Sequence, residues 1–400
     1  VLLICHFVCR CRALPLCGKI CVQQTLSLLA GKPKGFSSPS IARPCRHGNK
    51  KRFTTDIMYA IIGKTKKRIP KGVVSMENEV KRIGILTSGG DAPGMNACIR
   101  AVVRAALGRG IECVGIRRGW SGLINGDIMT MDNASVSRII NRGGTMLYTA
   151  RSEEFRTEEG QQKAVNTCKL LGLDGIVAIG GDGTFRGAQE LSKHGIAVVG
   201  IPGTIDEDIV CTEYTIGFDT AANTAVECID RLRDTMQSHE RCAVVEVMGR
   251  RAGYLALYVA MAVGATAVLV PEVPYDFDTQ VVEKIRRARL AGKTNFMIVV
   301  AEGAASGMAV GEQIRKELGL DPRVTILGHI QRGGSPTAHD RVMATRMGVE
   351  AVRVLAEGRT SRVICYRSGR IVDLDIDEGL SMQKTLDPEE LAVMETMTGL

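Results

Sequence analysis

A pattern that recurs along the chain after residue 80 limits the fold more than any other feature of the sequence. A short run of apolar, mostly β-branched residues ends in a glycine-rich turn, and a helical pattern follows the turn. Such runs occupy Arg82–Thr87, Gly175–Ile179, Ile196–Ile201, Ala243–Val247 and Phe296–Val300. Strands that are apolar throughout are typical of parallel sheets with helices on both faces. The sequence therefore predicts an α/β fold, and 400 residues are enough for two domains.

The composition excludes several classes of protein. Apolar residues make up 45% of the chain and charged residues 24%, which is the balance of a soluble globular protein. No stretch approaches the length of uncharged apolar sequence that a transmembrane helix needs, so the sequence predicts no membrane span.

The positive charge of the chain lies in its first 75 residues. They hold 15 Lys and Arg and one acid, whereas residues 76–400 hold 37 Lys and Arg and 42 Asp and Glu. The rest of the chain is mildly acidic, which argues against a nucleic-acid partner. The basic segment has no sustained helix or strand period, and Met76 precedes the first strong strand. It is a transit peptide, a disordered basic tail or translated sequence upstream of the true start, and we favour the third interpretation.

The cysteines are divided in the same way. Six of 13 lie in residues 1–75, and the other seven are scattered among apolar segments without paired spacing. This distribution is typical of reduced thiols and predicts a cytoplasmic protein. The cysteines of the first segment do not match zinc-finger spacing, so we expect no metal site there.

Ligands of parallel sheets bind beyond the carboxyl ends of the strands, where the glycine-rich turns are expected. The first turn, Ser88–Gly94, leads into a predicted helix over Met95–Leu107 and offers backbone N–H groups to an anion; a plain strand-to-helix turn is the alternative. The second turn, Gly180–Thr184, precedes a predicted helix over Thr184–His194 and adds the carboxylate of Asp182. That carboxylate is either a Mg²⁺ ligand beside bound phosphates or a helix N-cap.

The third turn is the most specific of the three. Pro202–Asp208 brings Asp206, Glu207 and Asp208 together directly after a buried strand. Crowded carboxylates cost free energy unless a metal ion, a proton-transfer role or nearby arginines stabilise them. An exposed acidic loop is the alternative, but it fits poorly beside so apolar a strand. The turn therefore predicts a functional site.

Cationic side chains that could bind phosphate lie in or beside the other loops. They are Arg151, Arg241, Arg250, Arg323 and Arg332, and we expect them to gather near strand ends. The polar turn Leu327–Gly334 adds His329, for which we expect contact with phosphate or sugar. The motifs of P-loop kinases, protein kinases and dinucleotide-binding proteins are missing from the sequence. Phosphoryl transfer is still feasible, because the chain supplies phosphate-binding turns, a Mg²⁺ ligand, cations and a base.

Five segments together resemble the ATP-dependent phosphofructokinases of the bacterial type. The resemblance runs from about Lys81 to the C-terminus, and its motifs are Ile85–Asn96, Gly180–Thr184, Gly200–Asp208, Val245–Gly253 and Leu327–Arg341. It implies the phosphofructokinase fold, with two Rossmann-like parallel-sheet domains after a disordered or spurious extension over residues 1–79. The larger, ATP-binding domain would comprise residues 80–217 and 331–381, and the smaller, sugar-phosphate-binding domain residues 218–330 and 382–400.

This resemblance implies phosphoryl transfer from MgATP to the 1-hydroxyl of fructose 6-phosphate, the committed step of glycolysis. Asp206 would take the proton from that hydroxyl, Asp182 would hold Mg²⁺, and Thr204, Arg250 and Arg151 would complete the catalytic set. The residues implied for ATP binding are Gly90, Arg151, Ser152, Gly181, Asp182, Gly183 and Thr184. Those implied for fructose 6-phosphate are Thr204, Ile205, Asp206, Met248, Gly249, Arg250, Glu302, His329, Ile330, Gln331 and Arg332, with Arg241 and Arg323 reaching over from a neighbouring subunit of a homotetramer.

The resemblance also implies an effector site for ADP or phosphoenolpyruvate. Its basic residues would be Arg100, Arg104, Arg233 and Lys293, but Asn133, Thr266 and Ala291 replace an Arg, a Glu and a Lys of the family pattern. We therefore expect the family's usual regulation to be altered.

Two departures from the family pattern fall in or near the expected active site. Trp120 stands where a tyrosine beside the adenine is common, which is a tolerable stacking change. Glu207 stands where the family usually has Asn. Its charge is expected to raise the pKa of Asp206 or to perturb Mg²⁺ affinity.

Alternative functions remain open. Pyrophosphate-dependent relatives typically carry Asp at the position of Gly183 and Lys at that of Gly203, so the two glycines favour ATP as donor. The second alternative is a weakly catalytic regulatory subunit that binds phosphate ligands, which Glu207 motivates and the retained Asp206 and Asp182 oppose. NAD kinases share the motif Gly180–Thr184, but the turns at 204–208 and 327–334 disfavour them.

Overall fold

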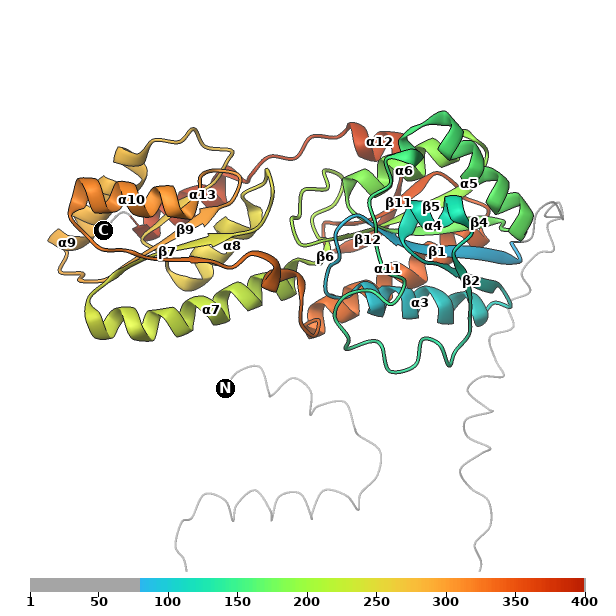
Figure 1. Ribbon diagram of the computed structural model, residues 1–400, viewed down its shortest axis with the longest axis horizontal. Coiled ribbons are helices and arrows are strands. Elements are labelled where there is room, and N and C mark those ends of the chain that lie inside the picture. The colour runs from blue at the N-terminus through green and yellow to red at the C-terminus, as the bar shows by residue number, and fades with distance from the viewer. Residues whose placement is uncertain (1–79, 399–400) are drawn as a thin grey trace, which may run out of the picture. The chain divides into compact units, whose positions relative to one another are not determined.

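The structure is a computed structural model, and it describes residues 80–398 (Figure 1). The interpretation of the basic segment as an extension without function lies outside the described residues. Two sheets and the helices that cover them form the described part of the chain, which confirms the predicted α/β fold.

The larger sheet has the strand order β12-β11-β5-β4-β1-β2-β3, with β6 paired to the end of β5. Its strands are β1 (Arg82–Ser88), β2 (Glu112–Ile116), β3 (Ile128–Met131), β4 (Gly175–Gly180), β5 (Ala197–Thr204), β6 (Ile216–Gly217), β11 (Arg362–Arg367) and β12 (Arg370–Asp375). Pairing is parallel from β11 through β2, and β3 and β12 join antiparallel at the two edges. The carboxyl ends of β1, β4 and β5 therefore lie next to one another.

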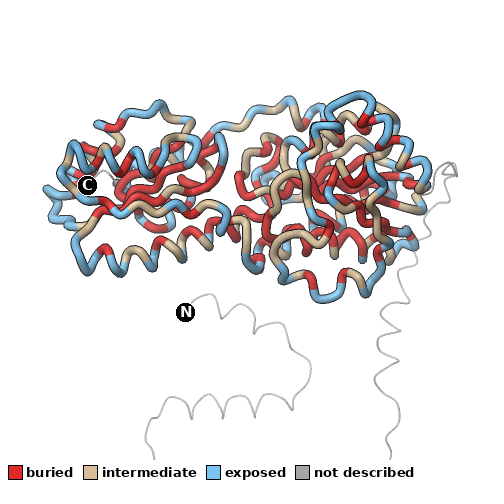
Figure 2. Tube along the Cα trace, viewed as in Figure 1, coloured by how far each residue is buried: buried red, intermediate tan, exposed pale blue. Residues whose placement is uncertain are grey.

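The central strands are apolar on both faces, as their sequences predict. Ile85 faces one side of the sheet and Leu86 the other, and each is fully buried in its own cluster of apolar side chains. The helices of the first face are α3 (Met95–Leu107) and α11 (Ala338–Ala356). Those of the second face are α4 (Gly119–Asn125), α5 (Glu158–Leu171), α6 (Asp182–Lys193) and α12 (Ile376–Ser381), with the short 3₁₀ helix η1 (Glu154–Arg156). Figure 2 shows the strands as the most continuously buried part of the chain.

The smaller sheet is parallel throughout, in the order β10-β7-β9-β8. Its strands are β7 (Cys242–Val247), β8 (Ala267–Leu269), β9 (Phe296–Ala301) and β10 (Arg323–Ile326). The helices of this part are α7 (Phe218–His239), α8 (Tyr254–Val263), α9 (Glu283–Leu290), α10 (Gly307–Leu318) and α13 (Pro388–Thr398), with the π-helix η2 (Asp278–Val282) and the 3₁₀ helix η3 (Gly328–Arg332). Side chains of α7 and α8 pack on one face of the sheet and those of α9 and α10 on the other.

The five strands predicted from apolar runs are confirmed as β1, β4, β5, β7 and β9. The first predicted helix has the predicted bounds, Met95–Leu107, whereas α6 begins two residues earlier than expected, at Asp182. The turn Leu327–Gly334 contains the helix η3. None of the helices among residues 80–398 is both long and apolar enough to cross a membrane.

Candidate active site

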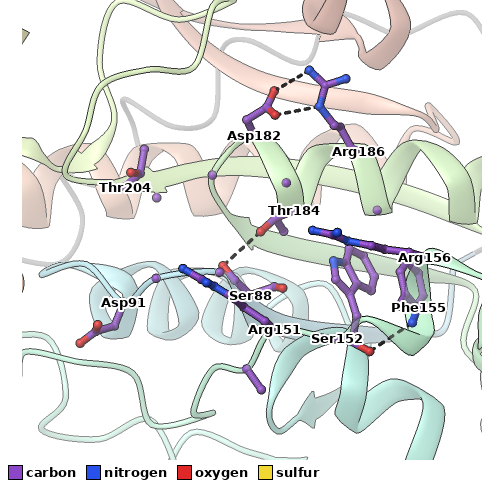
Figure 3. A pocket seen from close by; sticks show the side chains of 18 of the residues that line it. Ser88, Asp91, Arg151, Ser152, Phe155, Arg156, Asp182, Thr184, Arg186 and Thr204 are labelled. Atoms are coloured by element: carbon purple, nitrogen blue, oxygen red, sulfur yellow. Dashed lines mark hydrogen bonds and ion pairs between the residues drawn. The ribbon is translucent and has the colours of Figure 1, made fainter. Parts of the chain in front are cut away.

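A cavity of about 890 Å³ lies at the carboxyl ends of β1, β4 and β5 (Figure 3). All three glycine-rich turns contribute to its wall, together with loops that follow β3 and β7. The predicted site residues that line it are Gly90, Arg151, Ser152, Gly181, Asp182, Gly183, Thr184, Thr204, Ile205, Asp206, Arg250 and Arg332. The structure thus brings together the residues expected for ATP with five of those expected for the sugar phosphate.

The first two turns are held against each other by close backbone approach. The hydroxyl of Thr184 donates to the carbonyl of Ser88 at 3.1 Å (Figure 3). A Cβ atom at Gly180 would lie only 2.4 Å from that same carbonyl oxygen, and one at Gly90 would lie 2.8 Å from Arg332 Nη1. Glycine is therefore required at Gly180, where a backbone oxygen limits the space, whereas a side chain at Gly90 would displace the Arg332 guanidinium from the first turn.

The start of α6 forms one wall of the cavity. Gly181 is the N-cap residue, and no side chain among the described residues caps the helix. The first N–H groups of an α-helix have no intrahelical acceptor and carry partial positive charge, so this wall favours an anion. The N-cap alternative for Asp182 is wrong, because its carboxylate instead pairs with Arg186 at 2.8 Å, as Figure 3 shows.

Asp206 is the most deeply buried acid of the cavity wall, with 2% of its surface exposed. Its Oδ2 atom lies 3.3 Å from Arg250 Nε, and its backbone N–H donates to the Thr204 hydroxyl at 3.2 Å. Its Oδ1 atom has no hydrogen-bond partner among the described residues. An unpartnered carboxylate oxygen in a cavity wall is free to accept a hydrogen bond from a ligand.

Burial raises the pKa of Asp206 to about 6, and the negative charge of Asp208 adds to the effect. Arg250 and Arg332 act in the opposite direction, since both cations favour the charged carboxylate. A carboxylate with a pKa this close to neutrality is ionised at pH 7 and still basic enough to accept a proton.

Glu207, which stands where the family usually has Asn, contacts Lys384 near the C-terminus. Its backbone is left-handed, with φ of +54°, and its carbonyl accepts from Lys384 Nζ at 2.7 Å. Burial raises the pKa of its carboxyl to about 7, opposed by Lys384 and reinforced by Glu390. The main causes of the raised pKa of Asp206 are its burial and the charge of Asp208, and an effect of Glu207 on Mg²⁺ affinity stays a prediction.

The loop after β7 connects the cavity to the remaining sugar-phosphate candidates. Gln331 accepts a hydrogen bond from the backbone N–H of Met248 at 2.9 Å, and Glu302 accepts one from that of Arg250 at 2.9 Å. Gly249 has a φ of +143°, and a Cβ atom there would lie 2.6 Å from the carbonyl of Ala252. These contacts fix the loop that carries Arg250. On η3, His329 and Ile330 are exposed.

Two of the five arginines lie away from the cavity. Arg241 precedes β7, and Arg323 begins the adjacent strand β10, so both lie at the amino edge of the smaller sheet. Both lie at strand ends, but at the amino ends of β7 and β10, whereas the glycine-rich turns follow the carboxyl ends of β1, β4 and β5. Arg323 pairs with Asp321 at 3.0 Å.

The basic residues expected at an effector site fall into two groups. Arg233 and Lys293 line a separate small cavity of about 80 Å³ together with Thr266, and Arg233 donates to the carbonyl of Val263. Arg100 and Arg104 lie on α3, where burial and, to a smaller extent, the charge of the exposed Arg104 lower the pKa of Arg100.

Sequence reasoning anticipated Trp120 in the cavity but missed Phe155, its aromatic partner. Trp120 stacks on Phe155 with ring centroids 4.6 Å apart and planes 13° from parallel. The indole Nε1 of Trp120 is buried without a partner among the described residues. Further lining residues that were not predicted include Arg156 and Arg186. The signal available in the sequence was the isolated Phe155 in a polar run four residues after Arg151.

Comparison with known proteins adds independent evidence. The phosphofructokinase family model matches residues 82–355. The chain belongs to the phosphofructokinase family. Within that family, it is 55% identical over 308 residues to ATP-dependent 6-phosphofructokinase 1 of Clostridium perfringens, covering 77% of this chain and 96% of that protein. It is 54% identical over 310 residues to the ATP-dependent 6-phosphofructokinase of Shouchella clausii, covering 78% and 97%.

Solved structures of the family share the fold. The phosphofructokinase of Saccharomyces cerevisiae matches with a TM-score of 0.71 and 35% identity, covering 80% of this chain and 47% of that longer chain. The Pichia pastoris phosphofructokinase in the T-state matches with a TM-score of 0.72 and 34% identity, covering 80% and 37%. A pyrophosphate-dependent phosphofructokinase of Marinobacter aquaeolei, at 19% identity and a TM-score of 0.70, has the same fold.

Proposed function

We propose that the chain transfers the γ-phosphoryl group of ATP to the 1-hydroxyl of fructose 6-phosphate and releases ADP and fructose 1,6-bisphosphate. The observation that carries this proposal is the position of Asp206. Its buried carboxylate has an unpartnered oxygen and shares one cavity with two glycine turns and the N-terminus of α6. A kinase must activate the acceptor hydroxyl and bind the donor phosphates, and the cavity offers a base for the first and backbone N–H groups for the second.

The ATP phosphates are proposed to lie between the turn at Gly90 and the start of α6, where backbone N–H groups and Arg151 surround them. Trp120 and Phe155 would contact the nucleoside, since they give the cavity its aromatic wall. Gly183 favours ATP over pyrophosphate as the donor, because the space around its Cβ position is open to 4 Å and leaves room for a nucleotide.

Asp206 is proposed to accept the hydrogen of the sugar 1-hydroxyl at Oδ1 and then the proton, as the hydroxyl oxygen attacks the γ-phosphorus. Arg250 keeps the carboxylate oriented through Oδ2. Arg250 and Arg332 also supply positive charge beside the transferring phosphoryl group, where negative charge must be stabilised. The 6-phosphate is assigned to the loop after β7 and to η3, with Met248, Gly249, Glu302, His329, Ile330 and Gln331 near it.

Asp182 is the proposed Mg²⁺ ligand. No group of three or more metal-binding side chains gathers within the described residues. Mg²⁺ is commonly held by one or two carboxylates together with substrate phosphates, so a single cavity carboxylate next to a phosphate site fits the ion. Asp182 would exchange its pairing with Arg186 for the ion, which when bound offsets the charge of the phosphates.

The proposal includes the predicted domain division, an effector site for ADP or phosphoenolpyruvate, a cytoplasmic location and a homotetramer. Arg241 and Arg323 support the last of these. Both lie at the sheet edge opposite to the chain's own cavity, as expected if they reach the sugar phosphate of a neighbouring subunit.

The test is a coupled assay of fructose 1,6-bisphosphate formation by the full chain with either ATP or pyrophosphate at saturating Mg²⁺. We expect turnover with ATP and none above background with pyrophosphate. Turnover with pyrophosphate alone would overturn the donor assignment. If neither donor works while ATP still binds, a regulatory subunit is the better description.

A further inference from the structure

Two cysteines meet behind the loop that carries Asp206. Cys211 follows that loop, Cys365 lies in the middle of β11, and the Cys365 thiol donates to Cys211 Sγ at 3.5 Å. All seven cysteines among the described residues are free, and this is the only pair of them with a sulfur–sulfur contact. Cys211 has 3% of its surface exposed and Cys365 none.

The backbones on either side hold the two sulfurs in place. The N–H of Tyr366 donates to the Thr212 hydroxyl at 2.9 Å, and the N–H of Glu213 donates to the carbonyl of Tyr366 at 2.9 Å. Because these hydrogen bonds join residues next to Cys211 to the residue next to Cys365, they keep the two thiols close. Joining them needs an approach of the sulfurs to about 2 Å, the length of a disulfide bond.

The thiol contact also makes the two sulfurs chemically unequal. The hydrogen bond from Cys365 lowers the pKa of Cys211 and raises the pKa of Cys365, and the cations Arg367 and Lys384 act on Cys211 in the same direction. By contrast, burial raises the pKa of the Cys113, Cys168 and Cys242 thiols to about 12. Cys211 is therefore the thiol suited to form a nucleophilic thiolate.

We propose that Cys211 and Cys365 form an oxidisable dithiol that hydrogen peroxide converts to a disulfide, and that closing it slows the enzyme. The Cys211 thiolate attacks one peroxide oxygen, so that an S–O bond forms, the O–O bond breaks and the released hydroxide takes up a proton to become water. The Cys365 sulfur then attacks Cys211 Sγ, so that the S–S bond forms and the S–O bond breaks. The hydroxyl leaves as water with the Cys365 proton, and two electrons have passed from the thiols to the peroxide.

The effect on the enzyme follows from which partner can move. Cys365 is fixed in β11, which pairs with β5 on one side and β12 on the other. The segment from Ile209 to Cys211 lies outside the strands and helices, so it must take up most of the contraction. Only Ile209 and Val210 separate Cys211 from Asp208, so a movement of Cys211 also displaces the loop that positions Asp206. This part of the inference rests on the proposed function.

The first readout is the covalent link itself. After peroxide treatment of the full chain, digestion with trypsin and a glutamate-specific protease should give a linked pair of peptides, Asp208–Glu213 and Val363–Arg367, each with one cysteine. We expect this pair in oxidised protein and its loss after treatment with dithiothreitol. The assignment does not depend on the cysteines of residues 1–75, which lie in other peptides.

The second readout is turnover, which should fall several-fold with the appearance of the linked peptide and recover with dithiothreitol. Cys365→Ser should give no linked peptide and a Cys211 sulfenic acid that dimedone captures, whereas the matched variant Cys168→Ser should behave like the wild type. Peroxide that oxidises other thiols without linking this pair would overturn the proposal. A linked pair with unchanged turnover would overturn the effect on the enzyme. If the chain has no phosphofructokinase turnover at all, the peptide readout still decides whether the dithiol exists.

Discussion

Arg250 Nε lies 3.3 Å from one carboxylate oxygen of Asp206, while the other oxygen of Asp206 is buried without a hydrogen-bond partner among the described residues. One oxygen is thus held and the other is available. Arg250 has a left-handed backbone, with φ of +55°, which costs free energy in a non-glycine residue and is often retained at functional sites. The pair provides the first test of the proposed mechanism.

Replacing Asp206 with Asn should lower kcat by about 10²–10⁴-fold, the usual contribution of a general base. The same change should stabilise the fold at pH 7.5. The pKa of Asp206 is raised from 3.8 to about 6, so the folded state binds more protons than the unfolded state between these values, and stability falls as pH rises through that window. Removing the charge recovers up to about 3 kcal/mol. Steady-state kinetics and thermal melts check both effects, with the exposed Asp234→Asn as control; a lower Tm in Asp206→Asn would point to a structural role.

The pH profile should report the same carboxylate. We expect kcat/KM to fall on the acid side with an apparent pKa near 6, because protonated Asp206 cannot accept the hydroxyl proton. Asp208→Asn removes a charge that raises this pKa, so the acid limb should move to lower pH. An acid limb that stays in place in this variant would contradict the electrostatic coupling of the two acids.

Glu207→Asn should leave kcat within about twofold and raise Tm above pH 7. Its carboxyl pKa is raised from 4.5 to about 7, so its charged form destabilises the fold as pH rises through this range. Asn also tolerates the left-handed backbone better than Glu. Glu207→Gln removes the charge alone, and comparing the two variants by thermal melts from pH 5 to 8 separates charge from backbone. A large gain in kcat from Asn would instead support the regulatory-subunit hypothesis.

Gly183→Asp should fold normally and raise the KM for ATP by at least about tenfold. The space around its Cβ position is open to 4 Å, so the fold accommodates the side chain, while a carboxylate there repels the phosphates and fills nucleotide space. Gly180→Ala is the contrasting variant, because its Cβ would lie 2.4 Å from the Ser88 carbonyl and should destabilise the protein. Melting curves and ATP titrations distinguish the two variants. If both variants changed Tm and the KM for ATP equally, the assignment of Gly183 to the ATP site would be refuted.

ATP binding should change the fluorescence of Trp120, the single tryptophan of the chain. Its ring stacks on Phe155 in the cavity wall, so a bound nucleoside alters its surroundings. Titration with ATP should give a saturable change, and fructose 6-phosphate alone a smaller one. Phe155→Ala should weaken ATP binding several-fold, since aromatic stacking contributes about 1 kcal/mol. A fluorescence change with fructose 6-phosphate but not with ATP would contradict the assignment of Trp120 and Phe155 to the nucleoside.

The sequence was sufficient to predict the central strands, because β1, β4, β5, β7 and β9 are apolar on both faces and end in glycine-rich turns. It did not predict β11 or its neighbour β12, which is an edge strand. Of these, β12 (Arg370–Asp375) mixes three charged with three apolar residues and is only half-buried, so its pairing depends on the strand beside it.

The site could be predicted to a similar extent. Residues of the turns gather because parallel strands end at a common edge, a rule that needs no coordinates. The placement of Trp120 and Phe155 depends on how α4 and η1 pack, and that of Arg241 and Arg323 on the direction of β7 and β10. Contacts between segments distant in sequence, such as Lys384 with Glu207 and Cys365 with Cys211, leave no periodic signal.

The strand order of the larger sheet also affects how the protein is made. On the ribosome, β5 emerges well before β11, and all four strands of the smaller sheet are synthesised in between. Until β11 is synthesised, β5 presents an open edge, and the larger sheet stays incomplete. A chaperone that shields such an edge during translation should therefore increase the yield of active protein more than one added after release.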